Sequence, residues 1–242
     1  MESVAHFMFG IFGNAFALLL FLSPAITFSR IIKNRSTENF SGIPYVMTLL
    51  NCLLSAWYGL PFVSPNNLLV STINGFGTGI EIIYVLIFIT LAPKKERFKI
   101  IGLLTFVLIV FLLVVVVSLF VLHHYPRKLF CGLLASIFSI IMYSSPLSIM
   151  RLVIRTKSVE FMPFFLSLFM FLCAVSFFAF GLLGRDPFVA APNGVGTALG
   201  AMQLILYSVY RENRGTPKTE EEALEMGEAN PKPPQEKQSN AS

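Results

Sequence analysis

The sequence predicts an all-α membrane protein with seven transmembrane helices, and three observations support this prediction. Of the 242 residues, 55% are hydrophobic and only 13% are charged, and the mean hydropathy is +0.73. Soluble domains carry about 25% charged residues, so the composition excludes a water-soluble globular domain. The chain also contains seven apolar runs, and a pattern of three such runs occurs twice.

The seven apolar runs are long enough to form helices that cross a bilayer. Each run contains 20 to 24 residues, and a spanning helix needs about 20. They fill the chain to residue 210 and leave no room for a soluble catalytic domain, so we expect no enzyme activity. The runs are residues 6–28, 44–63, 68–91, 100–122, 129–150, 163–183 and 188–210.

Lysine and arginine residues indicate the orientation of these spans. The loops after the first, third and fifth spans and the C-terminal tail hold fifteen of them, whereas the opposite loops hold only Arg127, Lys128 and Arg185. Because cytoplasmic loops are enriched in positive charge, we expect the N-terminus outside and the C-terminus in the cytosol. The polar tail, residues 213–242, is expected to be disordered. This topology explains the net charge of +5, which does not indicate nucleic-acid binding.

Two stretches of the chain repeat the same residues in the same order. Corresponding positions are separated by 122 residues in the first span and in most of the second span. The separation is 119 residues between Pro44 and Pro163 and in the third span. So many matches in one order indicate an internal duplication. The pairs are Ser23-Pro24 with Ser145-Pro146, Pro44 with Pro163, Tyr58-Gly59-Leu60 with Phe180-Gly181-Leu182, and Asn74-Gly75-x-Gly77-Thr78 with Asn193-Gly194-x-Gly196-Thr197.

The fourth run has no counterpart and lies between the two copies. A second copy that directly followed a three-span unit would have the opposite orientation in the membrane. One additional span between the copies gives both the same orientation. We therefore expect a 3+1+3 arrangement of parallel three-helix repeats, related by an axis along the membrane normal. The predicted boundaries are residues 1–98 for the first repeat, 99–126 for the linker helix, 127–212 for the second repeat and 213–242 for the tail.

Three motifs in these repeats resemble the SWEET family of sugar transporters, whose members contain two MtN3/saliva-type repeats. They are residues 33–38 leading into 41–45, residues 49–61, and residues 157–164. The resemblance covers about residues 5–212 and is strongest to the first clade of the plant family. It implies passive, bidirectional movement of glucose and related hexoses, a location in the plasma membrane, and assembly into homo- or hetero-oligomers.

Two pairs of residues are candidates for binding the sugar. Asn74 and Asn193 offer amide donors and acceptors inside apolar spans, where an unpaired amide is costly; hydrogen bonds between helices are the alternative. Ser55 and Phe177 would supply a hydroxyl and an aromatic ring, although the Ser55 hydroxyl could instead bond to its own helix. The resemblance assigns both pairs to the sugar site, with Phe177 replacing the Trp that is usual in the first clade.

Four prolines and one outer pair of residues are candidates for gates. Proline removes a helix hydrogen bond and permits a kink, and the resemblance implies a ring of hinges at an inner gate. Two of the prolines, Pro44 and Pro163, could instead simply start their helices. The resemblance also implies an outer gate formed by Tyr58 and Asp186; a salt bridge from Asp186 to Arg185, or solvation, is the alternative. The hinge prolines are Pro24, Pro44, Pro146 and Pro163.

A proton-coupled transporter of the PQ-loop type, carrying another small solute, is the main alternative function. Glu81 lies inside the third span, and an intramembrane carboxylate is a candidate for proton transfer; a protonated packing residue is the other interpretation. Gly200 occupies the matching position of the second repeat, and the repeats carry Ser-Pro where PQ-loop proteins carry Pro-Gln. A seven-span receptor would share the topology but not the duplication.

No metal ion or cofactor is expected. His123 and His124 have no third ligand nearby in sequence, and no phosphate-binding glycine loop is present. Cys52, Cys131 and Cys173 lie inside apolar runs and are expected to be packing residues and not disulfides. The predicted partners are therefore a small-molecule sugar, membrane lipid, and other copies or relatives of the chain.

Overall fold

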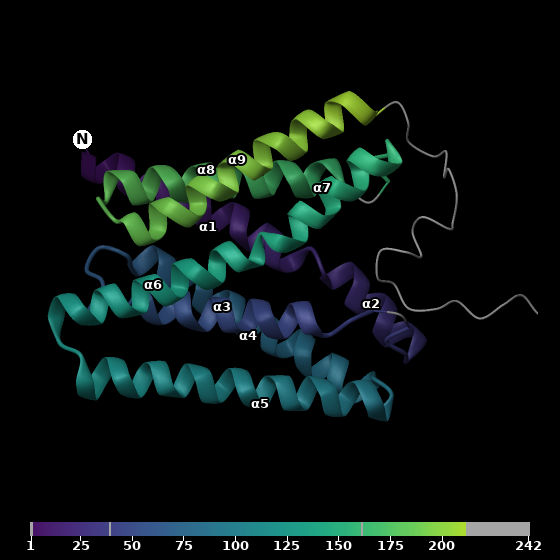
Figure 1. The fold of residues 1–242 in the computed structure, drawn as a ribbon, viewed down its shortest axis with the longest axis horizontal. Helices are drawn as coiled ribbons and strands as arrows, with labels where there is room; N and C mark the ends of the chain where they lie inside the picture. Colours follow the sequence, from purple (N-terminus) through teal and green to yellow (C-terminus); the bar gives the residue numbers. More distant parts are fainter. Residues whose placement is uncertain (1, 39, 161, 212–242) are drawn as a thin grey trace, which may run out of the picture.

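The computed structural model describes residues 2–38, 40–160 and 162–211, and every regular element in these ranges is helical (Figure 1). The predicted disordered tail, residues 213–242, lies outside the described residues. Because α1 with α2, and α6 with α7, each form one span, the helices make seven spans and confirm the all-α prediction. The helices are α1 (Glu2–Leu22), α2 (Ala25–Asn34), α3 (Ile43–Tyr58), α4 (Leu68–Leu91), α5 (Lys94–Val116) with a π-helical turn (Val117–Val121), α6 (His124–Met142), α7 (Ser144–Thr156), α8 (Phe164–Leu183) and α9 (Pro187–Tyr210).

The observed helices differ from the predicted runs mainly at their ends. Six spans are long and apolar enough to cross a membrane, whereas α3 has 16 residues and ends five residues before Val63. The chain leaves α3 through turns in which the amide of Val63 bonds to the carbonyl of Leu60. The fourth and fifth spans begin earlier than predicted, at Lys94 and His124, because amphipathic side chains can carry a helix beyond the hydrocarbon region.

The prediction that Arg127 and Lys128 lie in a loop is wrong. Both residues lie near the start of α6. The Arg127 guanidinium donates to the carbonyls of Ser118 at 2.7 Å and Leu122 at 3.1 Å. It therefore satisfies free carbonyls at the end of the preceding span, where a cation is also favoured by the helix dipole.

The first span of each predicted repeat is broken. Ser23 and Pro24 separate α1 from α2, and Tyr143 separates α6 from α7. Pro24 has no N–H group to continue the helix, and the Ser23 hydroxyl instead donates to the carbonyl of Leu20 at 2.8 Å. Each of these spans is therefore two helices with a joint between them.

The helices form two sets with matching internal contacts. In the first set α4 packs against α1, α2 and α3, and in the second α9 packs against α6, α7 and α8. The sets meet where α1 packs on α8 and where α3 packs on α6. These two contacts are equivalent, because α6 corresponds to α1 and α8 corresponds to α3 in the repeat. The linker helix α5 lies along one edge of the molecule, beside α3 and α4 (Figure 1). The space between the two sets holds the candidate site.

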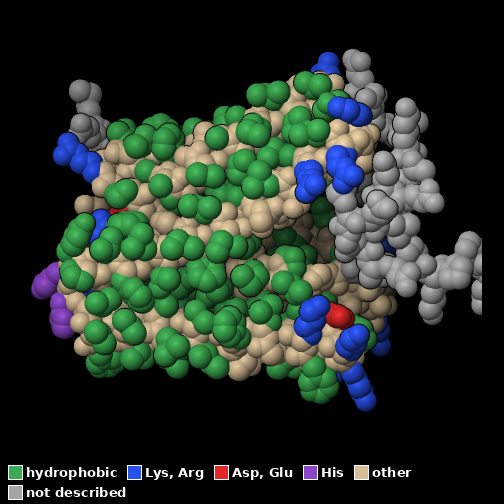
Figure 2. All heavy atoms as spheres, in the orientation of Figure 1, with side chains coloured by type: hydrophobic (Ala, Val, Ile, Leu, Met, Phe, Trp, Pro, Cys, Tyr) green, Lys and Arg blue, Asp and Glu red, His purple; other side chains and the backbone are tan. Residues whose placement is uncertain are grey.

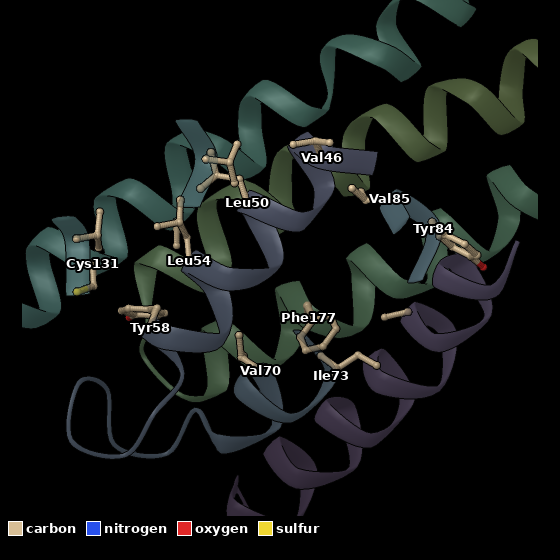
Figure 3. Close-up of a cluster of buried hydrophobic side chains, with 14 of the residues drawn as sticks. Val46, Leu50, Leu54, Tyr58, Val70, Ile73, Tyr84, Val85, Cys131 and Phe177 are labelled. Atoms are coloured by element: carbon tan, nitrogen blue, oxygen red, sulfur yellow. The ribbon is translucent and has the colours of Figure 1, made fainter. Parts of the chain in front are cut away.

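The surface has an apolar middle and one strongly basic end. Hydrophobic side chains cover much of the face seen in Figure 2, as expected for a surface that faces lipid. The exposed large hydrophobic residues include Phe76, Phe106 and Ile205. Lys and Arg gather at the end that carries α2, α7 and the start of α5, which is the cytosolic end by the positive-inside rule. Inside, a buried hydrophobic cluster joins the two sets (Figure 3).

Candidate functional site

A cavity of about 270 Å³ lies between the two sets of helices. Its walls come from α1, α3, α4, α6, α8 and α9, and the described residues that line it include no charged side chain. The surface is hollowed toward the cytosolic end, between the two sets (Figure 2). All four residues predicted at the sugar site are in the wall: Ser55, Asn74, Phe177 and Asn193.

Asn74 and Asn193 occupy equivalent positions in α4 and α9 and make equivalent hydrogen bonds. The amide nitrogen of Asn74 donates to the carbonyl of Val70 at 2.9 Å, and that of Asn193 donates to the carbonyl of Val189 at 2.8 Å. Within the described residues, these bonds stay in each helix and do not join helices. The second N–H and the carbonyl oxygen of each amide are left for a ligand in the cavity.

Ser55 and Phe177 lie on α3 and α8, the middle helices of the two sets. Both are largely buried, at 8% and 7% exposed. The Phe177 ring fits against Gly13 of α1, where a Cβ atom would lie 2.8 Å from it, and it belongs to the same buried cluster as Val70 (Figure 3). A hydroxyl and an aromatic ring therefore occupy positions related by the repeat.

The sequence analysis did not identify a polar contact across the cavity wall. The Ser139 hydroxyl of α6 donates to the side-chain oxygen of Asn51 in α3 at 3.0 Å, and both residues line the cavity. At the equivalent contact between α8 and α1, the Cys173 thiol lies 3.7 Å from the carbonyl of Gly13. At the offset of 122, Asn51 corresponds to Cys173. This pairing could have indicated that an amide in one repeat is replaced by a thiol in the other.

Asp186 is the centre of a buried polar group at the outer end of the cavity, the outer cluster (Tyr58, Ser64, Asn67, Lys128 and Asp186). Its carboxylate accepts hydrogen bonds from the Tyr58 hydroxyl at 2.6 Å, the Asn67 amide at 2.7 Å and the Ser64 hydroxyl at 3.2 Å. The Lys128 ammonium lies 3.0 Å from it. Tyr58 and Asp186 are therefore in contact, and the ion pair is with Lys128 instead of the expected alternative, Arg185.

The surroundings of Asp186 keep it ionised although it is only 2% exposed. Burial by itself raises the pKa of this carboxyl, but hydrogen bonds from Tyr58, Lys128 and Asn67 outweigh burial and hold the pKa below its ordinary value of 3.8. Asn67 and Asp186 also precede α4 and α9 directly, so the positive ends of two helices lie beside the charge. The outer cluster reaches the cavity through Tyr58, which is part of the cavity wall.

The four candidate hinge prolines all lie at the start of a helix. Pro24 caps α2 and Pro163 caps α8, whereas Pro44 and Pro146 lie in the first turns of α3 and α7. The positions of Pro44 and Pro163 therefore agree with the alternative that these prolines start their helices. Pro24 and Pro146 differ because each follows a break within a span, where the missing N–H weakens the connection between two helices.

Glu81 is buried in α4 away from the cavity. It is 3% exposed and is not part of the cavity wall. Among the described residues, one of its carboxyl oxygens, Oε2, has no hydrogen-bond partner. A solute held in the cavity would not touch this side chain.

Comparisons with known proteins agree over most of the chain. A family profile described as "Sugar efflux transporter for intercellular exchange" (MtN3_slv) matches residues 7–96 and 129–215. The chain is 70% identical over 213 residues to the bidirectional sugar transporter SWEET1 of Arabidopsis thaliana, covering 88% of this chain and 86% of that protein. It is 68% identical over 215 residues to the bidirectional sugar transporter SWEET1a of Oryza sativa subsp. japonica, covering 89% and 79%.

A solved structure of a eukaryotic SWEET transporter has the same fold. The TM-score is 0.86 at 50% sequence identity, and the match covers 88% of this chain and 99% of the other. The resemblance expected from the three sequence motifs is therefore confirmed at the level of both sequence and fold.

Proposed function

Because the chain belongs to the MtN3_slv family of sugar efflux transporters, we propose that it is a bidirectional, energy-independent uniporter of glucose and related hexoses in the plasma membrane. The observation that carries this proposal is the uncharged cavity between the two helix sets, with one amide contributed by the same position of each set. The activity is transport and not catalysis.

The chemistry of the cavity suits a neutral polyol. The free amide groups of Asn74 and Asn193 can bond to sugar hydroxyls as donors and acceptors, and the Ser55 hydroxyl can add another bond. The ring of Phe177 offers an apolar face to the C–H groups of a sugar ring. A phenyl ring lacks the N–H donor of the usual Trp, so binding here relies more on the two amides.

The size of the cavity favours a monosaccharide. Pockets for drug-sized ligands measure about 300–1,000 Å³, and this cavity, at about 270 Å³, lies below that range. A hexose fits this volume better than a larger sugar does.

The conformation of the chain supports alternating access. The outer cluster closes the outer end, and the surface is hollowed at the cytosolic end (Figure 2). For sugar to reach the outer side, the outer cluster separates while the cytosolic ends of the spans close, and the joints at Pro24 and Pro146 allow α2 and α7 to move. Both directions of flux use the same steps, so the sugar gradient sets the direction.

We extend the proposal to the organisation of the chain. Residues 1–98 and 127–212 act as two repeats joined by the linker helix of residues 99–126. The exposed apolar surface contacts lipid and provides room for assembly with further copies or with other family members. The two stretches matched by the family profile, residues 7–96 and 129–215, support this division.

Glucose flux in cells that lack hexose transporters tests the proposal. We expect radiolabelled glucose to move in both directions, and Asn193→Ala to lower flux about ten-fold or more at unchanged surface abundance, because a hydrogen bond lost in a buried site costs about 1–3 kcal/mol. Val195→Ala, on the exposed side of the same helix, is the matched control. Normal flux through Asn193→Ala would contradict the assignment of the sugar site. Absence of sugar flux in the wild type would contradict the proposed function.

A further inference from the structure

One aromatic side chain lies at, or directly before, the joint in each broken span. Phe21 lies three residues before Pro24, and Tyr143 lies three residues before Pro146. The two aromatic residues are equivalent at the offset of 122, and both line the cavity. They sit in the wall beside the points at which α2 and α7 can move relative to the rest of their spans.

Each of these rings rests directly on a buried glycine. A Cβ atom on Gly77 of α4 would lie 2.5–2.9 Å from the ring of Phe21, and a Cβ atom on Gly196 of α9 would meet the hydroxyl and ring of Tyr143. Real Cβ atoms essentially never come closer than 3.0 Å to another atom. The rings can therefore occupy these two places only because residues 77 and 196 have no side chain.

Other glycines in α4 do not share this property. A Cβ atom on Gly75 or Gly79 would meet nothing within 4 Å, and both residues are exposed. Within α4, the close approach of a ring is thus confined to Gly77. Gly196 of α9 lies at the equivalent position, 119 residues later, and holds the equivalent ring of Tyr143.

The two glycines lie between the amides and the cytosol. Gly77 follows Asn74 by three residues, and Gly196 follows Asn193 by three. Both helices run inward from the outer cluster, so each glycine is about 4.5 Å closer to the cytosolic end than its amide. A ring on either glycine therefore lies beside the path that a sugar takes from the amides to the cytosol.

A side chain of α4 forms a hydrogen bond to the backbone at the first joint. The Tyr84 hydroxyl donates to the carbonyl of Phe21 at 3.1 Å, a carbonyl next to the break between α1 and α2. Tyr84 also stacks on Phe28 of α2, with ring centroids 4.3 Å apart. Movement of α2 is therefore transmitted to the backbone that carries the Phe21 ring.

We infer that Phe21 and Tyr143 form a movable floor of the cavity, a role that rests on the proposed transport function. While the cytosolic side is open, the rings pack against Gly77 and Gly196 and leave the path to the cytosol open. While the outer side is open, the rings leave these glycines and cover the cavity beneath the sugar. The glycines are positioning residues for the inner gate.

The native Cys173 provides a readout that does not depend on sugar transport. Cys173 lines the cavity, whereas Cys52 and Cys131 are buried. Inside-out vesicles that contain the full chain are treated with a small, membrane-impermeant methanethiosulfonate, and modification of Cys173 is followed by peptide mass spectrometry. The rate measures how often the cavity is open to the cytosolic side.

We expect Gly77→Ala to lower both the rate of Cys173 modification and glucose flux about ten-fold. A methyl group added to a filled site typically shifts a conformational equilibrium by this factor or more. Here it destabilises only the cytosolic-open state, in which the ring packs against the glycine. Gly75→Ala is the matched control and should behave as the wild type in both assays. Adding Phe21→Leu to Gly77→Ala should restore the rate of modification, as should Tyr143→Leu added to Gly196→Ala.

Two results would overturn the inference. The first is Gly77→Ala that accumulates normally and is modified as fast as Gly75→Ala. The second is Gly77→Ala that does not fold, because a ring able to leave the glycine would let the chain fold in its outward-open state. If the wild type carries no glucose but Gly77→Ala still slows modification of Cys173, the proposed function fails and the movable floor stands.

Discussion

Asp186 shows how a single residue can be charged and buried although it lies outside the uncharged cavity wall. Hydrogen-bond donors from Tyr58, Asn67 and Lys128 surround its carboxylate, and the backbone amide of Phe188 adds a bond at 3.0 Å. A buried carboxylate without such partners would be too costly. These partners therefore allow the charge to stay buried, and water could take their place if the outer end opened.

The lowered pKa of Asp186 predicts transport that is insensitive to pH. A carboxyl whose pKa is depressed in the closed state stabilises that state above its ordinary pKa of 3.8, and this contribution is lost only as pH falls through the depressed pKa. Between about pH 5 and pH 7.5 the group stays ionised. Glucose flux measured across this window should change by less than about two-fold.

Asp186→Asn tests the charge itself. Asn keeps the shape of the side chain but removes the partner of Lys128, and hydrogen bonds to charged groups contribute about 1.5–3 kcal/mol. We expect glucose flux to fall about ten-fold or more at unchanged abundance. Arg185→Gln is the matched control, since it changes the charge of the exposed neighbouring residue. Equal flux through both variants would show that the ion pair does not hold the outer end closed.

The two broken spans are equivalent as elements, but their cytosolic helices pack differently. Phe28 and Ile31 of α2 belong to the main hydrophobic cluster, and Arg30 pairs with Glu38 at 2.6 Å in the loop after it. The buried Val153 of α7 belongs instead to a separate, smaller cluster at the cytosolic end. Since a small hydrophobic cluster opens more readily than one that is continuous with the main core, α7 should move further than α2.

Distances between spin labels test this difference between α2 and α7. Labels on Ile32→Cys and on Ile154→Cys, both at exposed positions, are each paired with a label on Phe106→Cys of α5. On addition of glucose, we expect the distance distribution from residue 154 to shift more than that from residue 32. Equal shifts, or a larger shift at residue 32, would contradict the account of the two helices.

At the scale of the whole molecule, the apolar runs and the repeat offset predicted most of the fold. Run length alone indicates spans, and the offset pairs positions such as Asn74 with Asn193 that the structure places in one cavity wall. The contact of Lys128 with Asp186 was not predicted, because it depends on how α6 packs beside α9. Nor were the helix ends, where polar residues extend α5 and α6 beyond their apolar runs.

The central claim is that one neutral cavity serves both membrane faces without an energy source. Equilibrium exchange in proteoliposomes tests this claim most directly. Vesicles loaded with unlabelled glucose are placed in the same concentration of glucose, to which a radiolabelled trace has been added. The account predicts rapid entry of the label with or without a protonophore, and little entry with Asn193→Ala. Entry of label that requires a proton gradient would contradict the account.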